Sequence, residues 1–145
     1  QREMKSLTVL VITILLFASC KKENETSAVP GMDSIDTVGQ TILLTGPFSN
    51  GPWGTVSGQA RVLRSANGAF TLVLQNVNIS SGPDLHVYLS KEVQPINFID
   101  LGLLKSTSGN QLYSISGAPD FSQYKYALIH CQKFDHLFGS ALLQP

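Results

Sequence analysis

Cys131, near the end of the chain, is the residue with the clearest capacity for chemistry. The only other cysteine among the 145 residues is Cys20. A thiol becomes a nucleophile or a ligand when it loses its proton, and nearby cations favour that state. His130 precedes Cys131 directly, His136 follows five positions later, and His86 lies in an earlier segment. His136 and His86 are therefore the candidates to share or tune a site with Cys131.

The strand that carries Cys131 decides which of these side chains can meet. Residues 125–132 are the most apolar strand-like segment, and side chains alternate between the two faces of a strand. Cys131 then shares an inward face with Ala127 and Ile129, and His130 points to the opposite face. His130 and Cys131 are therefore not expected to bind one metal ion together.

Two simpler interpretations stay open at this point. Free cysteine is among the most buried residue types, so Cys131 can be a packing residue without chemistry. His86 and His130 can be polar positions on the solvent face of their strands. An odd cysteine in an exported protein instead suggests a reactive thiol, a ligand or an intermolecular disulfide.

Several other classes of function find no support in the sequence. The motifs GxSxG, HExxH, CxxC and the P-loop are absent, and the cysteines and histidines lack a standard zinc spacing. Residues 40–145 carry six Lys or Arg and five Asp or Glu without a basic stripe, so nucleic acid is not an expected partner. A classical enzyme is therefore not favoured.

The elements that must position Cys131 are short strands. Gly, Pro, Asn and Ser separate apolar runs with a period of two, which indicates antiparallel β-structure. The expected strands are residues 41–46, 56–63, 68–77, 84–90, 101–106, 111–115, 125–132 and 139–144. Hairpin turns are expected at 67–68 and 107–110, and one helical turn at 118–124. We predict an all-β domain over 40–145, an antiparallel β-sandwich or small barrel of about eight strands.

The beginning of the chain resembles a bacterial lipoprotein signal peptide, residues 1–19. Basic residues precede an uncharged, apolar run at 7–19. This run is shorter than the roughly 20 residues that cross a bilayer, and it fits the core of a signal peptide. It ends in Leu-Phe-Ala-Ser-Cys, which resembles a lipobox and predicts cleavage before Cys20 with lipid on its sulfur. The alternative is an ordinary signal peptide with Cys20 as an incidental residue.

Residues 20–39 predict a flexible, lipid-anchored tether. They are charged, rich in Ser and Thr, and poor in large apolar side chains, so they cannot offset their own ordering entropy. Two or three acyl chains would hold the protein stably on a membrane. The segment resembles the tethers of lipoproteins of Bacteroidetes-type bacteria. We expect the domain to face the periplasm or the cell surface.

Three segments of the predicted domain together resemble the DM-thirteen family. They are GPDLHVYLS (82–90), LGLLKSTSGNQLYSI (101–115) and YALIHCQKFDHLFGSALL (126–143). The family has these motifs in the same order and at similar distances, ending with a late cysteine before an F-x-x-x-F-G-x-A stretch. The resemblance extends over about 42–143. One departure is residues 52–55, Pro-Trp-Gly-Thr, where the family commonly has a histidine.

The resemblance implies an electron-transfer domain. In the family the late cysteine is proposed to act as a naked thiol or as a ligand of a prosthetic group such as haem, and that position is Cys131 here. His86 or His136 would then supply the second ligand or tune the thiol, and a redox protein would be the partner. Two alternatives remain: a non-catalytic β-sandwich binding module, and a lipoprotein that binds copper through Cys and His. With Cys20 lipidated, Cys131 has no intramolecular disulfide partner.

Overall fold

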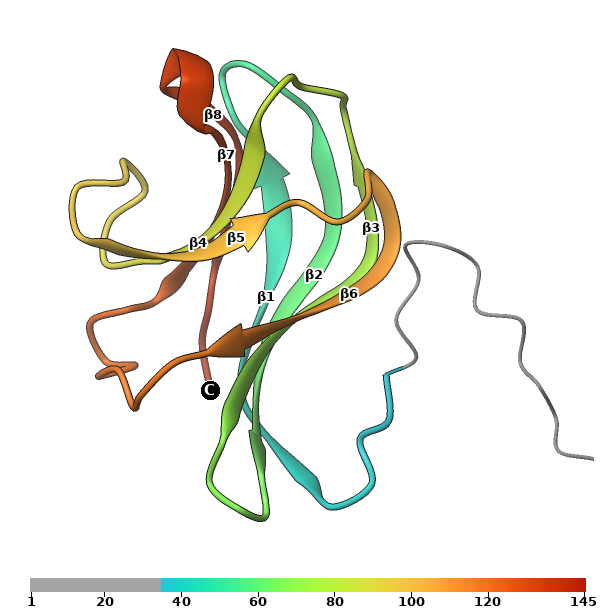
Figure 1. The fold of residues 1–145 in the computed structure, drawn as a ribbon, viewed down its shortest axis with the longest axis vertical. Coiled ribbons are helices and arrows are strands. Elements are labelled where there is room, and N and C mark those ends of the chain that lie inside the picture. Colours follow the sequence, from blue (N-terminus) through green and yellow to red (C-terminus); the bar gives the residue numbers. More distant parts are fainter. Residues whose placement is uncertain (1–34) are drawn as a thin grey trace, which may run out of the picture.

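The computed structural model describes residues 35–145, which form one eight-stranded antiparallel sheet curled into a nearly closed barrel (Figure 1). The predicted all-β class and the number of strands are therefore confirmed. The strands are β1 (Gln40–Asn50), β2 (Val56–Ser65), β3 (Phe70–Ile79), β4 (Leu85–Ser90), β5 (Phe98–Leu103), β6 (Ser108–Ile115), β7 (Tyr126–Cys131) and β8 (His136–Leu142). Between β7 and β8 lies the short 3-10 helix η1 (Gln132–Phe134). Within residues 35–145, no helix has the length and apolar character that a membrane span requires.

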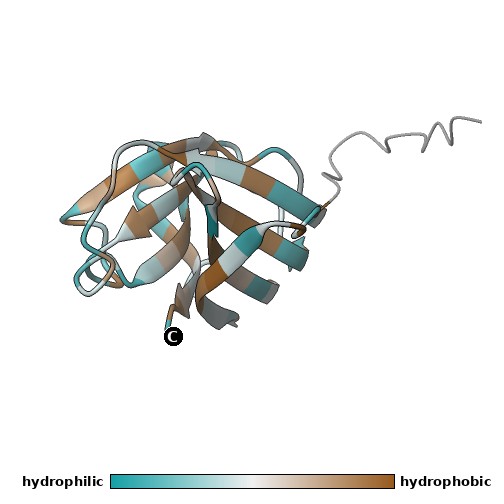
Figure 2. Cartoon of the chain, turned by 90° about the horizontal axis from the view of Figure 1, so that it is seen from below, coloured by the Kyte–Doolittle hydropathy of each residue, from teal (hydrophilic) through white to brown (hydrophobic). Residues whose placement is uncertain are grey.

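The order of strands around the barrel is β5-β4-β7-β8-β1-β2-β3-β6. The long strand β1 joins the two halves, because Gln40–Pro47 pair with β2 and Phe48–Asn50 pair with β8. The view along the barrel shows the strands wrapping around a common interior, with apolar and polar residues alternating along them (Figure 2). The order begins with β5 and ends with β6, so these two strands flank the seam of the barrel.

One predicted hairpin is confirmed and the other is wrong. β2 and β3 pair as a hairpin, and Gly68 in its turn has a positive φ of 86°. The hairpin predicted at 107–110 does not form, because β5 pairs with β4 and β6 pairs with β3. The fully buried Gln111 holds the connection instead. Its Nε2 donates to the carbonyl oxygen of Ser106 at 2.7 Å, and its Oε1 accepts from the hydroxyl of Tyr113 at 2.7 Å.

The segment from 118 to 124 makes a single turn. The backbone amides of Gln123 and Tyr124 donate to the carbonyl oxygen of Asp120 at 3.0 and 2.9 Å. The helix η1 was not expected from the sequence. It ends at Asp135, which has a left-handed backbone with φ 54°. This tight connection brings β8 back along β7 and so places His136 beside the end of β7.

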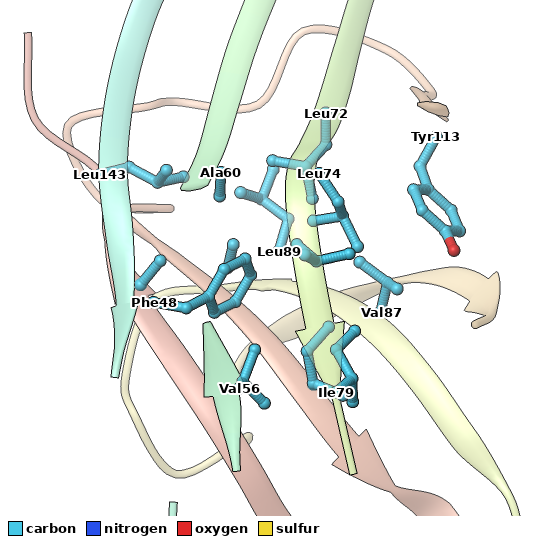
Figure 3. Close-up of a cluster of buried hydrophobic side chains, with 14 of the residues drawn as sticks. Phe48, Val56, Ala60, Leu72, Leu74, Ile79, Val87, Leu89, Tyr113 and Leu143 are labelled. Carbon is cyan, nitrogen blue, oxygen red and sulfur yellow. The ribbon is translucent and has the colours of Figure 1, made fainter. Parts of the chain in front are cut away.

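The interior of the barrel is one apolar core, and the inward faces of the strands supply it. Side chains from β1, β2, β3, β4 and β6 converge on the same space, as Figure 3 shows for Phe48, Ala60, Leu74, Leu89 and Tyr113. Leu74, Leu89 and Ala60 have no exposed surface. Each fully buried leucine contributes about 1.5–3 kcal/mol relative to an exposed one. Burial of these side chains therefore stabilises the sheet that carries Cys131.

Candidate functional site

Cys131 is the last residue of β7 and belongs to the main core. Its side chain has no exposed surface, which confirms the expected inward direction. In the β4–β7 ladder it lies opposite Leu85, and in the β7–β8 ladder it lies opposite His136. Cys131 holds the only sulfur atom of residues 35–145. A reagent in solution therefore cannot reach the thiol unless this end of β7 opens.

His136 lies between the expected strands 125–132 and 139–144, but in the structure it begins β8. Residues directly opposite each other in an antiparallel ladder project to the same face, so His136 shares the face of Cys131. Its imidazole stacks on the indole of Trp53, with ring centroids 3.8 Å apart and planes within 2°. Trp53 is 60% exposed. The structure thus brings His136 to the backbone of Cys131, and the ring itself is engaged by Trp53.

His86 and His130 lie on the opposite, outer face of the sheet. They are directly opposite each other in the β4–β7 ladder. The structure thus separates His86 from Cys131. The interpretation of His130 as a solvent-facing position is wrong, because only 4% of the residue is exposed. Its ring is covered by stacking on Tyr88, with centroids 5.3 Å apart, and by Asp135, whose Oδ1 lies 3.2 Å from Nε2.

Carboxylates surround both imidazoles on this face. For His86, the distance from Nδ1 to Oδ2 of Asp100 is 2.9 Å, and that from Nε2 to Oδ1 of Asp84 is 3.4 Å. The other histidine, His130, has a buried Nδ1 without a hydrogen-bond partner. We call the set His86, Tyr88, His130, Asp84, Asp100 and Asp135 the outer-face cluster.

Tyr88 is the centre of the outer-face cluster. Its ring lies between His130 and Phe98, whose centroid is 4.3 Å away. Burial raises the pKa of Tyr88, the charge of Asp100 adds to this, and a hydrogen bond with the Gln132 side chain opposes it. Asp84 and Asp135 also raise this pKa, so all three carboxylates act on the phenol. Tyr88 is therefore protonated at neutral pH.

His130 is also in its uncharged form at neutral pH. Burial lowers the pKa of His130, and the carboxylate of Asp135 only partly opposes this. The neighbouring His136 and His86 lower the pKa further. The charge of Asp135 is therefore not cancelled by the imidazole that it contacts.

Sequence reasoning missed most of the outer-face cluster. Alternation along β4 places Asp84, His86 and Tyr88 on one face, and this signal was available. Asp100 reaches His86 because the β4–β5 pairing has an irregular register between His86 and Tyr88. No sequence pattern predicts this irregularity. Asp135 reaches His130 because η1 ends in a left-handed residue.

A haem or copper centre does not fit Cys131 in this arrangement. The thiol is enclosed in the core, and two surface pockets, of about 490 and 310 Å³, are lined by other residues. Across the part of the chain that the structure describes, no three His, Cys, Asp or Glu side chains are grouped to hold a metal ion. The expected ligands also diverge, with His86 outside the barrel and Cys131 inside. We therefore derive no step through either group.

Comparison with known proteins identifies the domain. Neither the curated proteins nor the solved structures gave a match. The family model described as "Electron transfer DM13" matches residues 37–143, which is most of the chain and includes all eight strands of the barrel. The resemblance seen in the three sequence motifs is thereby confirmed, and the chain belongs to the electron transfer DM13 family.

Proposed function

We propose that this chain is a lipid-anchored electron-transfer domain that works outside the cytoplasm and uses the thiol of Cys131 as its redox group. The observation that carries the proposal is the family match over residues 37–143. The motif resemblance puts Cys131 at the position of the late family cysteine, and no other sulfur lies in residues 35–145.

The chemistry that a single thiol supports is exchange with a disulfide of another protein. The Cys131 thiolate attacks one sulfur of the partner disulfide, and a mixed disulfide forms between the two proteins. The second partner sulfur leaves as a thiolate and takes up a proton. One partner sulfur is thereby reduced to a thiol, and the other remains in the mixed disulfide with Cys131, so the exchange balances without a bound cofactor. A second thiol, such as glutathione, must then attack the sulfur of Cys131 to release the partner as a dithiol.

Access to the buried sulfur requires a local opening, and the end of β7 is suited to it. Cys131 is followed directly by η1, which contains no buried residue. One backbone hydrogen bond, from the amide of Gln132 to the carbonyl of Asp84 at 2.9 Å, continues the β4–β7 ladder beyond Cys131. Segments with few buried contacts open at a free energy well below that of global unfolding. Opening of η1 would expose the thiol without dismantling the barrel.

The anchor belongs to the same proposal. The apolar run 7–19 and the lipobox-like Leu-Phe-Ala-Ser-Cys support export and lipidation of Cys20. These residues and most of the predicted tether 20–39 lie outside the described residues 35–145. With the sulfur of Cys20 carrying lipid, Cys131 would be the free thiol of the mature protein.

Glutathione exchange on the folded protein tests the role of Cys131. The full chain is equilibrated with glutathione buffers of stepped potential, quenched with acid, and analysed by mass spectrometry. We expect a reversible glutathione adduct on the wild type and none on Cys131→Ala. Low urea, below the unfolding transition, should accelerate formation of the adduct. A folded wild type that gains no adduct, although the urea-unfolded protein does, would overturn the thiol proposal.

A second candidate function is a membrane-held binding module without redox chemistry. Complete burial of Cys131 among apolar side chains favours it, because a packing residue needs no access. The two candidates differ in the Cys131→Ala variant. A binding module keeps its activity in this variant, and a thiol exchanger loses it.

A further inference from the structure

The face of the barrel beside Cys131 has a charge distribution that the proposed thiol chemistry does not explain. Residues 40–145 are close to neutral, yet three of their five carboxylates, Asp84, Asp100 and Asp135, gather in the outer-face cluster. Asp135 is 91% exposed, and the side chains of Asp84 and Asp100 are about one third exposed. The cluster is therefore an open acidic patch on a domain whose other charged side chains are mostly basic, six Lys or Arg against two carboxylates.

Exposed apolar side chains adjoin the carboxylates. Phe98, which stacks on Tyr88, is 39% exposed. Leu103 lies opposite His86 in the β4–β5 ladder and is 62% exposed. Apolar side chains with a charged rim are the composition of a protein interaction surface. Together these residues form a patch along β5, β4 and the end of β7.

A buried polar group marks the middle of this patch. His130 lies between Tyr88 and Asp135, and its Nδ1 has no partner although the residue is 96% buried (4% exposed). Buried polar atoms in folded proteins normally have a hydrogen-bond partner. Because His130 is uncharged at neutral pH, it does not neutralise the exposed carboxylate of Asp135, which remains available to a ligand.

We propose that this patch is the docking surface for a basic redox protein. The inference rests on the proposed function, because it names the partner for the Cys131 site. Opposite charges steer the encounter, and electron-transfer partners commonly meet through small, weak interfaces.

The position of the patch relative to the thiol supports this assignment. The backbone carbonyl of Asp84 accepts the hydrogen bond from Gln132 that holds down the end of β7, and Asp135 ends η1. A partner docked on these two residues lies beside the segment that must open to expose Cys131. Lysine or arginine side chains of that partner would also stabilise the thiolate form, which is the reactive species.

The test is a binding titration of the isotope-labelled full chain, followed by NMR, with two cationic probes. One probe is decalysine, and the other is cytochrome c, used only for its lysine-rich face. The patch variant is the double substitution Asp84→Asn and Asp135→Asn. The matched control is the double substitution Asp36→Asn and Asp120→Asn, which changes the net charge equally. Both residues belong to other segments than the patch: Asp36 precedes β1, and the Asp120 carboxylate accepts hydrogen bonds from Ser122 and Gln123 within its own turn.

We expect both probes to shift the amide signals of β4, β5 and η1 and the patch variant to bind about 5- to 10-fold more weakly at low salt. The control should bind like the wild type. Equal losses in both variants, shifts centred on β2 and β3, or no binding of either probe would overturn the docking surface.

Failure of the docking proposal can be told from failure of the thiol proposal. Binding is measured without any redox reaction, and Cys131→Ala should bind the probes as the wild type does. If Cys131→Ala binds the probes normally and the wild type forms no glutathione adduct, the docking surface is supported and the redox role of the thiol is contradicted. If the adduct forms and the probes do not bind, the thiol chemistry stands and the basic partner is wrong.

Discussion

Cys131 contributes to the core whatever chemistry its sulfur performs. Its neighbours in the β4–β7 and β7–β8 ladders are in place, and none of its surface is exposed. A hydroxyl at this position would be buried in an apolar environment, whereas a methyl group would leave only a small void.

Substitution of Cys131 by serine should therefore lower the free energy of unfolding by about 1–3 kcal/mol, and substitution by alanine by less. Urea unfolding followed by tryptophan fluorescence measures both values. A serine variant as stable as the wild type would mean that the hydroxyl finds a partner and that the site is more polar than its surroundings indicate.

Gly139 in β8 is fixed by close contact with other strands. A Cβ atom at this position would lie 2.5 Å from Cγ2 of Val56 and 2.9 Å from the carbonyl oxygen of Ser49. Gly139 lies opposite Asn50 of β1 on one side and Ile129 of β7 on the other. Because β8 is paired on both sides here, it has little freedom to move away.

We expect Gly139→Val to lower stability by about 1–3 kcal/mol through overpacking. Thermal and urea unfolding measure the loss. The neighbouring Ser140→Val, on a partly exposed position of the same strand, is the control and should cost much less. Equal stability of Gly139→Val and the wild type would show that β8 can shift.

At the scale of elements, the β4–β7 ladder carries a pH dependence through His130. Burial lowers the pKa of His130 in the folded protein below its ordinary value of about 6.5. The unfolded chain therefore binds more protons than the folded one as the pH falls through this range. The free energy of unfolding therefore has its full value when the pH is above the ordinary histidine pKa, and it decreases as the pH falls below that pKa.

His130→Gln should weaken this decrease. The urea midpoints of the wild type and the variant are compared between about pH 7.5 and pH 5. The wild type should lose more stability than His130→Gln over this range. Parallel curves for the wild type and His130→Gln would contradict a neutral, buried imidazole.

Much of the barrel could be predicted from its alternating pattern, but only the β4 part of the outer-face cluster could. The period of two within residues 84–90 puts Leu85, Val87 and Leu89 on one face, and all three are buried. The same pattern set Cys131 inward. It also assigned His130 to solvent, because alternation gives the face of a side chain but not what covers that face. Here the cover comes from Tyr88 and from Asp135 beyond β7.

The hairpin predicted at 107–110 failed for a related reason. A Ser-Gly-Asn stretch between two apolar runs is a strong local turn signal. The packing of the whole barrel nevertheless determines which strands pair. In this barrel β6 pairs with β3 and contributes its inward side chains to the core. The side chain of Gln111, buried and bonded to Ser106, replaces the expected turn.

At the scale of the whole molecule, the proposed tether and anchor would decide where the barrel works. A lipidated Cys20 would hold the domain at a membrane surface, and the predicted tether 20–39 would set its reach. This leads to a prediction about Cys20 that is independent of the barrel. Radiolabelled palmitate should enter the wild type in a bacterial host, and Cys20→Ala should carry none. Label retained by Cys20→Ala would contradict the lipobox.

From the pairing of β1 with two partners we expect the barrel to assemble in a definite order. β1, β2 and β3 follow one another in sequence and pair as neighbours, so this part of the sheet can form early. The end of β1 must wait for β8, because Phe48 lies opposite Ala141. Pairing of distant segments is slow, since the entropy of loop closure is lost first. β7 lies between β4 and β8, so the sulfur of Cys131 is covered only when these late strands arrive. The thiol is therefore most vulnerable to oxidants in the newly made chain, and quick closure of the barrel protects it.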